Sequence, residues 1–289
     1  SQLGTRYAHT VARWNGHFWT DLSASLPAGG VHSLAAFDDD GPGPHLPQLY
    51  AGADSVYRFN GSSWTLVGSF LPSGGCSTCT HSRVMHLLSF DDDGPGPNPD
   101  ALYAVQYVYN DPPPATSITE WTNVYRFDGA TWLLIHNGPG YPASAAIFDE
   151  DDAGPLPPSL MVGTQQYQPQ SFGRLERFRG GAWSDVLNQP DQYPASMCVF
   201  DDDGPGPVPP ALYIGGRTIA GSTQVPLSRW DGASLSPASS GLPGFVNTLG
   251  AVDATGAGDQ LYALTYDIFN YKLYRRDGGR RAAAHAVVD

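Results

Sequence analysis

The sequence predicts an all-β fold built from repeated antiparallel sheets, because one phrase recurs along the chain at a period that suits one small sheet. The phrase is clearest as FDDDGPGP followed by a Leu-Tyr pair, and the 289 residues hold five copies with starts 53, 58, 52 and 52 residues apart. The copies begin at Phe37, Phe90, Phe148, Phe200 and, in degraded form, Val252. Composition agrees, since 34 Gly and 26 Pro supply turns while 41% hydrophobic and 12% aromatic residues supply a core.

Each repeat contains four predicted strands, which the first copy illustrates. Residues 31–37 and 48–52 are short apolar runs and are predicted to be buried strands. The acidic Gly-Pro segment between them is predicted to be a turn, because proline cannot donate to a sheet ladder and glycine has no side chain to pack. Residues 56–61 end in Asn-Gly, the pair most typical of tight hairpins, and residues 63–67 follow as the fourth strand. The repeat is therefore a four-stranded meander.

The second hairpin of the repeat occurs once more than the first. Its signature is an Arg, a Gly three residues later and, in most copies, a Trp on the fourth strand; it occurs six times against five, at Arg13, Arg58, Arg126, Arg177, Arg229 and Arg275. Residues 1–30 hold only this hairpin. We expect one domain over residues 1–289, with repeats at about 31–83, 84–141, 142–193, 194–245 and 246–289.

This layout resembles kelch-like β-propellers, which repeat four-stranded meanders at a similar period with a Gly pair after strand two and a Trp on strand four. Here Gly215 and Gly216 supply the full pair. The chain is similar at the same level to tachylectin-like five-bladed lectin propellers and to the acid-Gly-Pro propeller repeats of large secreted bacterial proteins. The resemblance covers nearly the whole chain and implies a β-propeller, but it carries over no catalytic residue.

Five first strands favour five blades, and a six-bladed propeller with one incomplete blade is the alternative. The surplus N-terminal hairpin is expected to close the ring onto residues 261–265. Alternatively it belongs to the incomplete sixth blade, or it self-associates by completing the sheet of a neighbouring molecule.

Charge and hydropathy exclude several partners. The formal net charge is −13 and Lys272 is the only lysine, so a nucleic-acid backbone is not an expected partner. No apolar run approaches the roughly 20 residues of a membrane-spanning helix. The sequence starts at Ser1 with neither an initiator Met nor a signal peptide, which suggests a processed product. Together with the composition, this favours an extracellular or cell-surface location.

The connections of the meander divide into two sets that leave opposite ends of the strands. The acidic loops and the Asn/Asp-Gly turns are nearly the same in every repeat, whereas the other connections vary in length and sequence. Because binding residues concentrate on variable loops of a rigid scaffold, we expect ligand-binding residues in the variable set. Aromatic side chains there suit stacking on a glycan or anchoring a protein ligand. The candidates are Tyr107, Tyr109, Trp121, Tyr167 and Phe172.

The acidic loops have two interpretations. Adjacent carboxylates beside a glycine are hard oxygen ligands suited to Ca²⁺, and integrin-type propeller loops are similar, although the acids here are contiguous rather than alternating. The calcium candidates are Asp38, Asp40, Asp91, Asp93, Asp149, Asp151, Asp201 and Asp203. The other interpretation is an ion pair with the strand-three arginine of the same repeat, for instance Asp38 with Arg58, which is favoured because the arginine and the loop recur together.

The cysteines support no covalent haem site, because a Thr separates Cys79 from His81. We expect a local disulfide between Cys76 and Cys79, with zinc bound by these cysteines, His81 and His86 as the alternative. Cys198 falls in a predicted first strand, where an inert buried thiol is expected.

A polar residue stands four positions before the repeat start in every copy. The five are Ser33, His86, Ser144, Ser196 and Thr248. In a propeller they would form a ring around the central channel, where they hold water or a small polar ligand.

No nucleophile triad, phosphate loop or facing acid pair stands out, so no cofactor is required and an enzyme with a site at the channel mouth has no residue-level support. We therefore expect a non-enzymatic recognition module, with a structural subunit of a surface layer or fibre as the alternative.

Overall fold

The computed structural model describes residues 11–27, 29–41, 43–44, 46–70, 81–94, 100–110, 120–152, 154–166, 172–190, 192–204, 206–220, 223–238, 242–253, 259–267 and 270–277. These residues form 21 strands and no helix, which confirms the all-β prediction. Within the same ranges there is accordingly no helix long and apolar enough to cross a bilayer.

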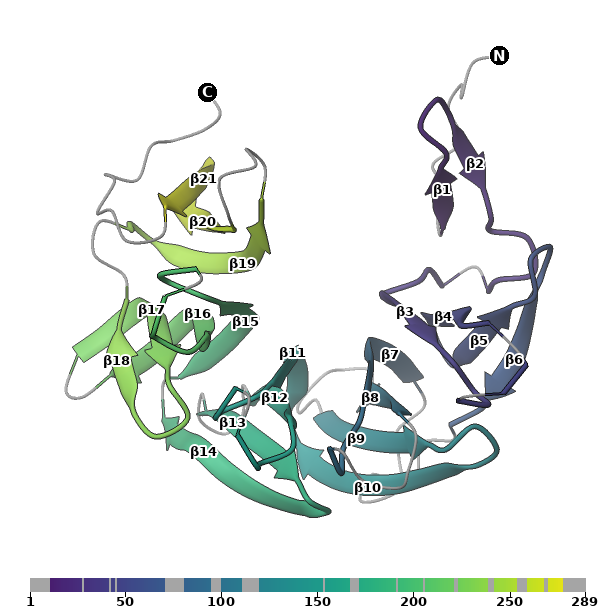
Figure 1. The fold of residues 1–289 in the computed structure, drawn as a ribbon, viewed down its shortest axis with the longest axis horizontal. Coiled ribbons are helices and arrows are strands. Elements are labelled where there is room, and N and C mark those ends of the chain that lie inside the picture. The colour runs from purple at the N-terminus through teal and green to yellow at the C-terminus, as the bar shows by residue number, and fades with distance from the viewer. Residues whose placement is uncertain are drawn as a thin grey trace. The chain divides into compact units, whose positions relative to one another are not determined.

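The chain divides into two compact units, Ser1–Phe90 with Asn98–Pro139, and Asp91–Pro97 with Gly140–Asp289 (Figure 1). The first unit contains a two-stranded sheet of β1 (Ala12–Trp14) and β2 (Trp19–Asp21). Its second sheet is formed by β3 (Ser33–Phe37), β4 (Gln48–Gly52), β5 (Val56–Phe59) and β6 (Trp64–Gly68). Its third sheet is formed by β7 (His81–Phe90), β8 (Ala101–Tyr109), β9 (Glu120–Phe127) and β10 (Trp132–Pro139).

The second unit contains three further sheets. One is formed by β11 (Tyr141–Phe148), β12 (Ser159–Gln166), β13 (Phe172–Arg179) and β14 (Ala182–Pro190). The next is formed by β15 (Tyr193–Phe200), β16 (Ala211–Ala220), β17 (Thr223–Trp230) and β18 (Leu235–Pro237). The last is formed by β19 (Phe245–Val252), β20 (Gln260–Asp267) and β21 (Asn270–Asp277).

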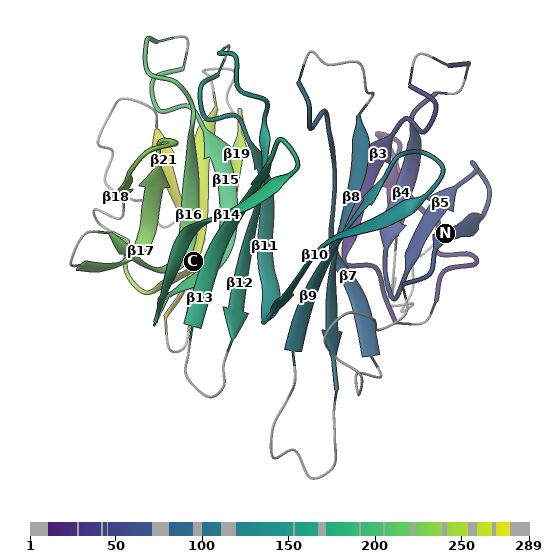
Figure 2. The same cartoon turned by 90° about the horizontal axis from the view of Figure 1, so that it is seen from below.

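The four-stranded sheets are antiparallel meanders in chain order, as the repeat predicts, and the last sheet is a three-stranded meander. β1 and β2 form a single hairpin, and the arrangement is consistent with propeller-like blades. In such a meander the first and third connections leave one end of the strands and the second connection leaves the other (Figure 2). We call the end with the acidic loops and the Asn/Asp-Gly turns the regular end. The opposite end, which carries the variable connections, is the irregular end.

Neighbouring sheets in a unit pack through a glycine on the second strand. A Cβ on Gly163 of β12 would lie 2.9 Å from the Cγ of Pro194, which begins the first strand of the next sheet. In the same way, a Cβ on Gly52 would lie 2.8 Å from Val84 Cγ1, and a Cβ on Gly215 would lie 2.5 Å from Val246 Cγ1. The glycine that follows strand two is therefore required because the next sheet approaches its backbone closely.

In the first unit, the strand-four tryptophans attach their sheets to the preceding ones. Trp64 Nε1 donates a hydrogen bond to the carbonyl oxygen of Leu22, just after β2, at 2.6 Å. Trp132 Nε1 donates to the carbonyl oxygen of Val67 in β6 at 3.1 Å. Their rings also stack on strand-three phenylalanines, as Phe127 does on Trp132 with ring centroids 4.7 Å apart. Each tryptophan thus buries apolar surface while its polar N–H is satisfied.

Replacing Gly163 by Ala should destabilise the fold by about 1–3 kcal/mol, because the added methyl group overpacks the contact with Pro194. Chemical denaturation monitored by tryptophan fluorescence measures the loss. The matched control is Gly250→Ala in β19, where a Cβ would meet nothing within 4 Å. Equal effects of the two substitutions would contradict the packing argument.

Candidate functional site

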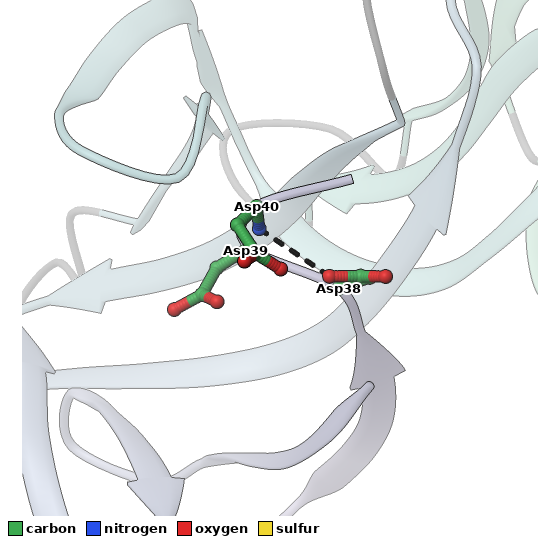
Figure 3. Close-up of side chains that lie close together, drawn as sticks. All are labelled: Asp38, Asp39 and Asp40. Carbon is green, nitrogen blue, oxygen red and sulfur yellow. Dashed lines mark hydrogen bonds between the residues drawn. The ribbon is translucent and has the colours of Figure 1, made fainter. Parts of the chain in front are cut away.

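The acidic loops are built from side chains with three different roles, and the first acid closes the turn. Asp38 Oδ1 accepts a hydrogen bond from the backbone N–H of Asp40 at 3.3 Å (Figure 3). The same bond recurs from Asp93 to Asp91, from Asp151 to Asp149 and from Asp203 to Asp201, at 3.2, 3.3 and 3.2 Å. Burial, and then the neighbouring Asp151, raise the pKa of Asp149 above its usual range. The first acid is therefore a local cap of the loop.

A glycine then turns the chain. Gly41, Gly94 and Gly204 have φ angles of 59°, 67° and 63°, in the region that favours glycine. In the third loop Asp152 occupies this place with φ 55°, a conformation that aspartate tolerates better than most residues. The next glycine in the loop donates back to the third acid, as Gly43 N does to the Asp40 carbonyl at 3.2 Å.

The second acid pairs with the strand-three arginine. Arg58 Nη1 lies 2.6 Å from Asp39 Oδ2, so the ion pair expected in the repeat forms, but with Asp39 rather than with Asp38. Figure 3 shows the reason, since the carboxylate of Asp39 is directed away from that of Asp38. Tyr50 of β4 donates its hydroxyl to the same carboxylate at 3.4 Å. Burial, followed by the charge of Asp39, raises the pKa of Tyr50 to about 12, so Tyr50 stays a protonated donor.

The fourth repeat reproduces this cluster and extends it to the next sheet. Asp202 accepts hydrogen bonds from the Tyr213 hydroxyl and, at 3.1 Å, from Arg229 Nε. Its other oxygen lies 3.0 Å from Arg276 Nη2 of β21. Burial and the hydrogen bond to Asp202 raise the pKa of Tyr213 well above its usual range. The carboxylate therefore joins two sheets of the second unit.

The third repeat builds the same cluster from different residues. Met161 takes the register position of the tyrosine, since it pairs with Ala146 as Tyr50 pairs with Ala35. The second acid is Glu150, and its carboxylate lies 2.7 Å from Arg177 and 2.6 Å from Arg179. Only 6% of the Glu150 side chain is exposed. The longer acid and the second arginine thus replace the missing tyrosine hydroxyl.

The third acid supports the remainder of the loop. Asp151 Oδ2 accepts from the backbone N–H of Leu156 at 3.1 Å, and Asp203 Oδ2 accepts from that of Val208 at 3.3 Å. Gly154 and Gly206 lie against these carboxylates, with no room for a Cβ. The three acids of a loop therefore all take part in its construction.

The calcium interpretation stays a prediction. Carboxylate oxygens of Asp38, Asp39 and Asp40 lie within 4.8 Å of one another, as do those of Asp91, Asp92 and Asp93. These groups have the hard oxygen chemistry that Ca²⁺ prefers. In the first loop, however, an arginine already compensates the charge of the middle carboxylate.

The predicted polar column lies on the first strands of the sheets. A β-bulge directly precedes His86, Ser144, Ser196 and Thr248, because the register shifts by one residue there. Ser144 Oγ donates to the Pro194 carbonyl of the next sheet at 2.6 Å, so it serves packing between sheets. The Oγ atoms of Ser33 and Ser196 are buried without a hydrogen-bond partner among the described residues. The ring formed by all five stays a prediction, because they are divided between the two units.

At the irregular end the structure brings together two of the predicted aromatic residues and separates a third. Tyr107 and Tyr109 stack with ring centroids 4.7 Å apart, as expected for side chains two positions apart on one strand. Trp121 faces the other side of this sheet, where it packs against Val108 with its indole N–H buried. Phe172 lies at the start of β13 in the second unit. Tyr167, Cys76 and Cys79 lie outside the described residues.

Two residues that the aromatic prediction omitted complete the cluster. His81 of β7 is the cross-strand partner of Tyr109, and their rings stack at 5.1 Å. The Arg83 guanidinium carbon lies 5.6 Å from the centroid of Tyr109. On the other side Tyr107 donates its hydroxyl to Glu120 Oε1 at 2.7 Å. Alternation along β7 places His81 and Arg83 on one face, but only the register with β8 shows that this is the tyrosine face.

Cys198 is a free, half-buried thiol on β15. Burial raises the pKa of this thiol, so it stays protonated at neutral pH, and the inertness expected of a thiol in a first strand stays a prediction.

Glu150→Asp should destabilise the protein, because the shorter side chain draws a buried carboxylate away from Arg177 and Arg179. Met161→Tyr should also destabilise it, because the phenol crowds Glu150. The double substitution recreates the Tyr-Asp-Arg cluster of the other repeats and should recover about 1–3 kcal/mol of coupling in a double-mutant cycle. Strict additivity of the two losses would show that these residues do not form one cluster.

Removal of calcium should leave the melting temperature unchanged, because an arginine and backbone donors already bind oxygens of the loop acids. An ion bound only to the native state would instead stabilise it, by about 2.7 kcal/mol at a hundred times the dissociation constant. Thermal denaturation in chelator, in calcium and in magnesium at equal ionic strength measures the difference. A rise specific to calcium would establish the metal interpretation.

Comparisons with known proteins were made for the whole chain. No protein-family model matches the sequence, and no curated protein matches it at a significant level. The function of this chain is therefore inferred from its own contacts.

Proposed function

We propose that this chain is a non-enzymatic extracellular recognition module with a five-bladed β-propeller fold. Its ligand is a glycan or protein that binds at the irregular end. The observation that carries the proposal is the cluster of His81, Arg83, Tyr107 and Tyr109 on one face of β7 and β8. His81 and Arg83 are exposed and Tyr109 is partly exposed, while the ring of Tyr107 is buried beneath them.

The chemistry of this cluster suits recognition. Aromatic rings pack against the apolar faces of sugars and anchor protein interfaces, while hydroxyl and guanidinium groups supply directional hydrogen bonds. The rings stand on long strands that pair over nine positions from His81 to Phe90, so the scaffold holds them rigidly. Rigid aromatic side chains lose little conformational entropy on binding.

Among the described residues, the regular end offers no comparable set. Its acids bind arginines and backbone donors, and its turns lie close to the neighbouring sheet, since a Cβ added to Gly232 would lie 3.0 Å from the Cβ of Glu150. Groups repeated in every sheet and already engaged in each one support construction rather than individual recognition. This contrast favours the irregular end as the binding surface.

A structural subunit of a surface layer or fibre is the second candidate, and one observation favours it. The β1–β2 hairpin exposes Trp14, Phe18 and Trp19 by 49%, 59% and 53%. Exposed aromatic surface of this kind is typical of protein contacts. Concentration-dependent assembly in analytical ultracentrifugation, lost in a Trp14→Ser, Trp19→Ser variant, would support this candidate.

Glycan-array binding, followed by calorimetry on the best ligand, tests the first candidate. Tyr109→Ala should weaken binding by about tenfold or more, since it removes the central ring of the cluster. Tyr271→Ala is the matched control, because that tyrosine is 63% exposed and lies in the second unit. Absence of saturable binding to any glycan, together with assembly, would instead favour the structural subunit.

A further inference from the structure

The arginines of this chain separate into two groups by their partners. Arg58, Arg177, Arg179, Arg229 and Arg276 form ion pairs with loop acids at the regular end. Arg83 differs, because among the described residues its guanidinium contacts no carboxylate and its side chain is exposed. In a chain with 28 acidic residues, an exposed arginine without an acidic partner has its hydrogen-bond donors available.

The neighbours of Arg83 stabilise its positive charge without occupying its N–H donors. Its guanidinium lies 5.6 Å from the centroid of Tyr109, and a ring in this position stabilises the cation without using its in-plane N–H donors. Burial, and then the positive charge of Arg83, lower the pKa of His32, so Arg83 acts on this part of the surface electrostatically. In the same cluster, Glu120 Oε1 accepts a hydrogen bond from the Tyr107 hydroxyl.

The second unit repeats this combination at its own irregular end. The guanidinium carbon of Arg174 lies 5.6 Å from the centroid of Phe172, two residues earlier on β13. Arg217 of β16 is exposed and is the cross-strand partner of Tyr193. In both units, an arginine without an acidic partner among the described residues thus stands beside an aromatic ring at the irregular end.

We propose that His81, Arg83 and Tyr109 form a binding site for an acidic saccharide. The sugar packs along the exposed side of the aromatic stack, and its carboxylate or sulfate accepts two parallel N–H bonds from Arg83. The inference rests on the proposed recognition function and names its ligand class. The acidic regular end disfavours approach of the same ligand there, so charge also orients the encounter.

Calorimetry with three hexasaccharides tests the site: hexagalacturonate for the carboxylate, a heparin-derived hexasaccharide for the sulfate, and neutral cellohexaose. We expect one acidic probe to bind and Arg83→Gln to weaken it by about tenfold or more, as for a lost charge-assisted hydrogen bond. Arg13→Gln is the matched control, since Arg13 is an exposed arginine on β1, outside the cluster.

The NMR titration of His32 gives a second readout. The bound anion should raise the pKa of His32 in the wild type, and Arg83→Gln should raise it without any ligand, because in each case the positive field of Arg83 is reduced. An unchanged His32 pKa in Arg83→Gln would overturn the electrostatic argument.

The outcomes separate this inference from the proposed function. Binding of cellohexaose as tightly as the acidic probes, abolished by Tyr109→Ala but not by Arg83→Gln, would overturn the acidic ligand and keep glycan recognition. Binding of the acidic probes that both Arg83→Gln and Arg13→Gln leave unchanged would also overturn the site. If none of the three probes binds, the proposed site is overturned. If the glycan array also shows no binding, glycan recognition is overturned too.

Discussion

In the first, third and fourth repeats, the pair between the second loop acid and the strand-three arginine is the interaction on which the rest of the sheet depends. It links the connection between strands one and two to strand three, and through Arg276 it reaches the neighbouring sheet. A largely buried carboxylate such as Glu150 tolerates burial only with its partners in place. The loop therefore holds one conformation, and the capping bonds and glycine turns around it take the same form in successive repeats.

The third repeat shows that the cluster, rather than any single residue, is what the fold requires. In the third repeat Glu150 replaces an aspartate, Met161 replaces the tyrosine, and Arg179 replaces the asparagine or aspartate of the other turns, so the cluster keeps a carboxylate with several donors. A change in one member is compensated by changes in the others because they share one buried site. The repetition of the sequence phrase thus reflects a conserved physical arrangement that allows more than one composition.

This construction leaves the two ends of the sheets with different chemistry. At the regular end, loop acids bind arginines and backbone donors, and turn glycines lie close to loop acids or to the next sheet. At the irregular end, the long strands β7 and β8 carry Arg83, Tyr107 and Tyr109. The same three residues do not recur together in the other repeats. A rigid scaffold with individual side chains at one end is the arrangement that recognition proteins commonly use. The proposed acidic saccharide fits this end because it supplies an anion to Arg83, which contacts no carboxylate in the part of the chain that the structure describes.

Local sequence signals predict the all-β class, the meander, the turns and the pairing of a loop acid with the strand-three arginine. These signals are the repeat period, the proline and glycine of the turns, and the alternation of side chains along the strands. They do not predict the partner of Arg58, since Asp38, Asp39 and Asp40 are identical in sequence and only the path of the turn directs Asp39 toward strand three. Tyr107 and Tyr109 are neighbours by alternation alone. Their separation from Trp121, and their contact with His81 and Arg83, depend on the pairing register of β7, β8 and β9. Register is set by long-range strand pairing, which a local pattern does not contain.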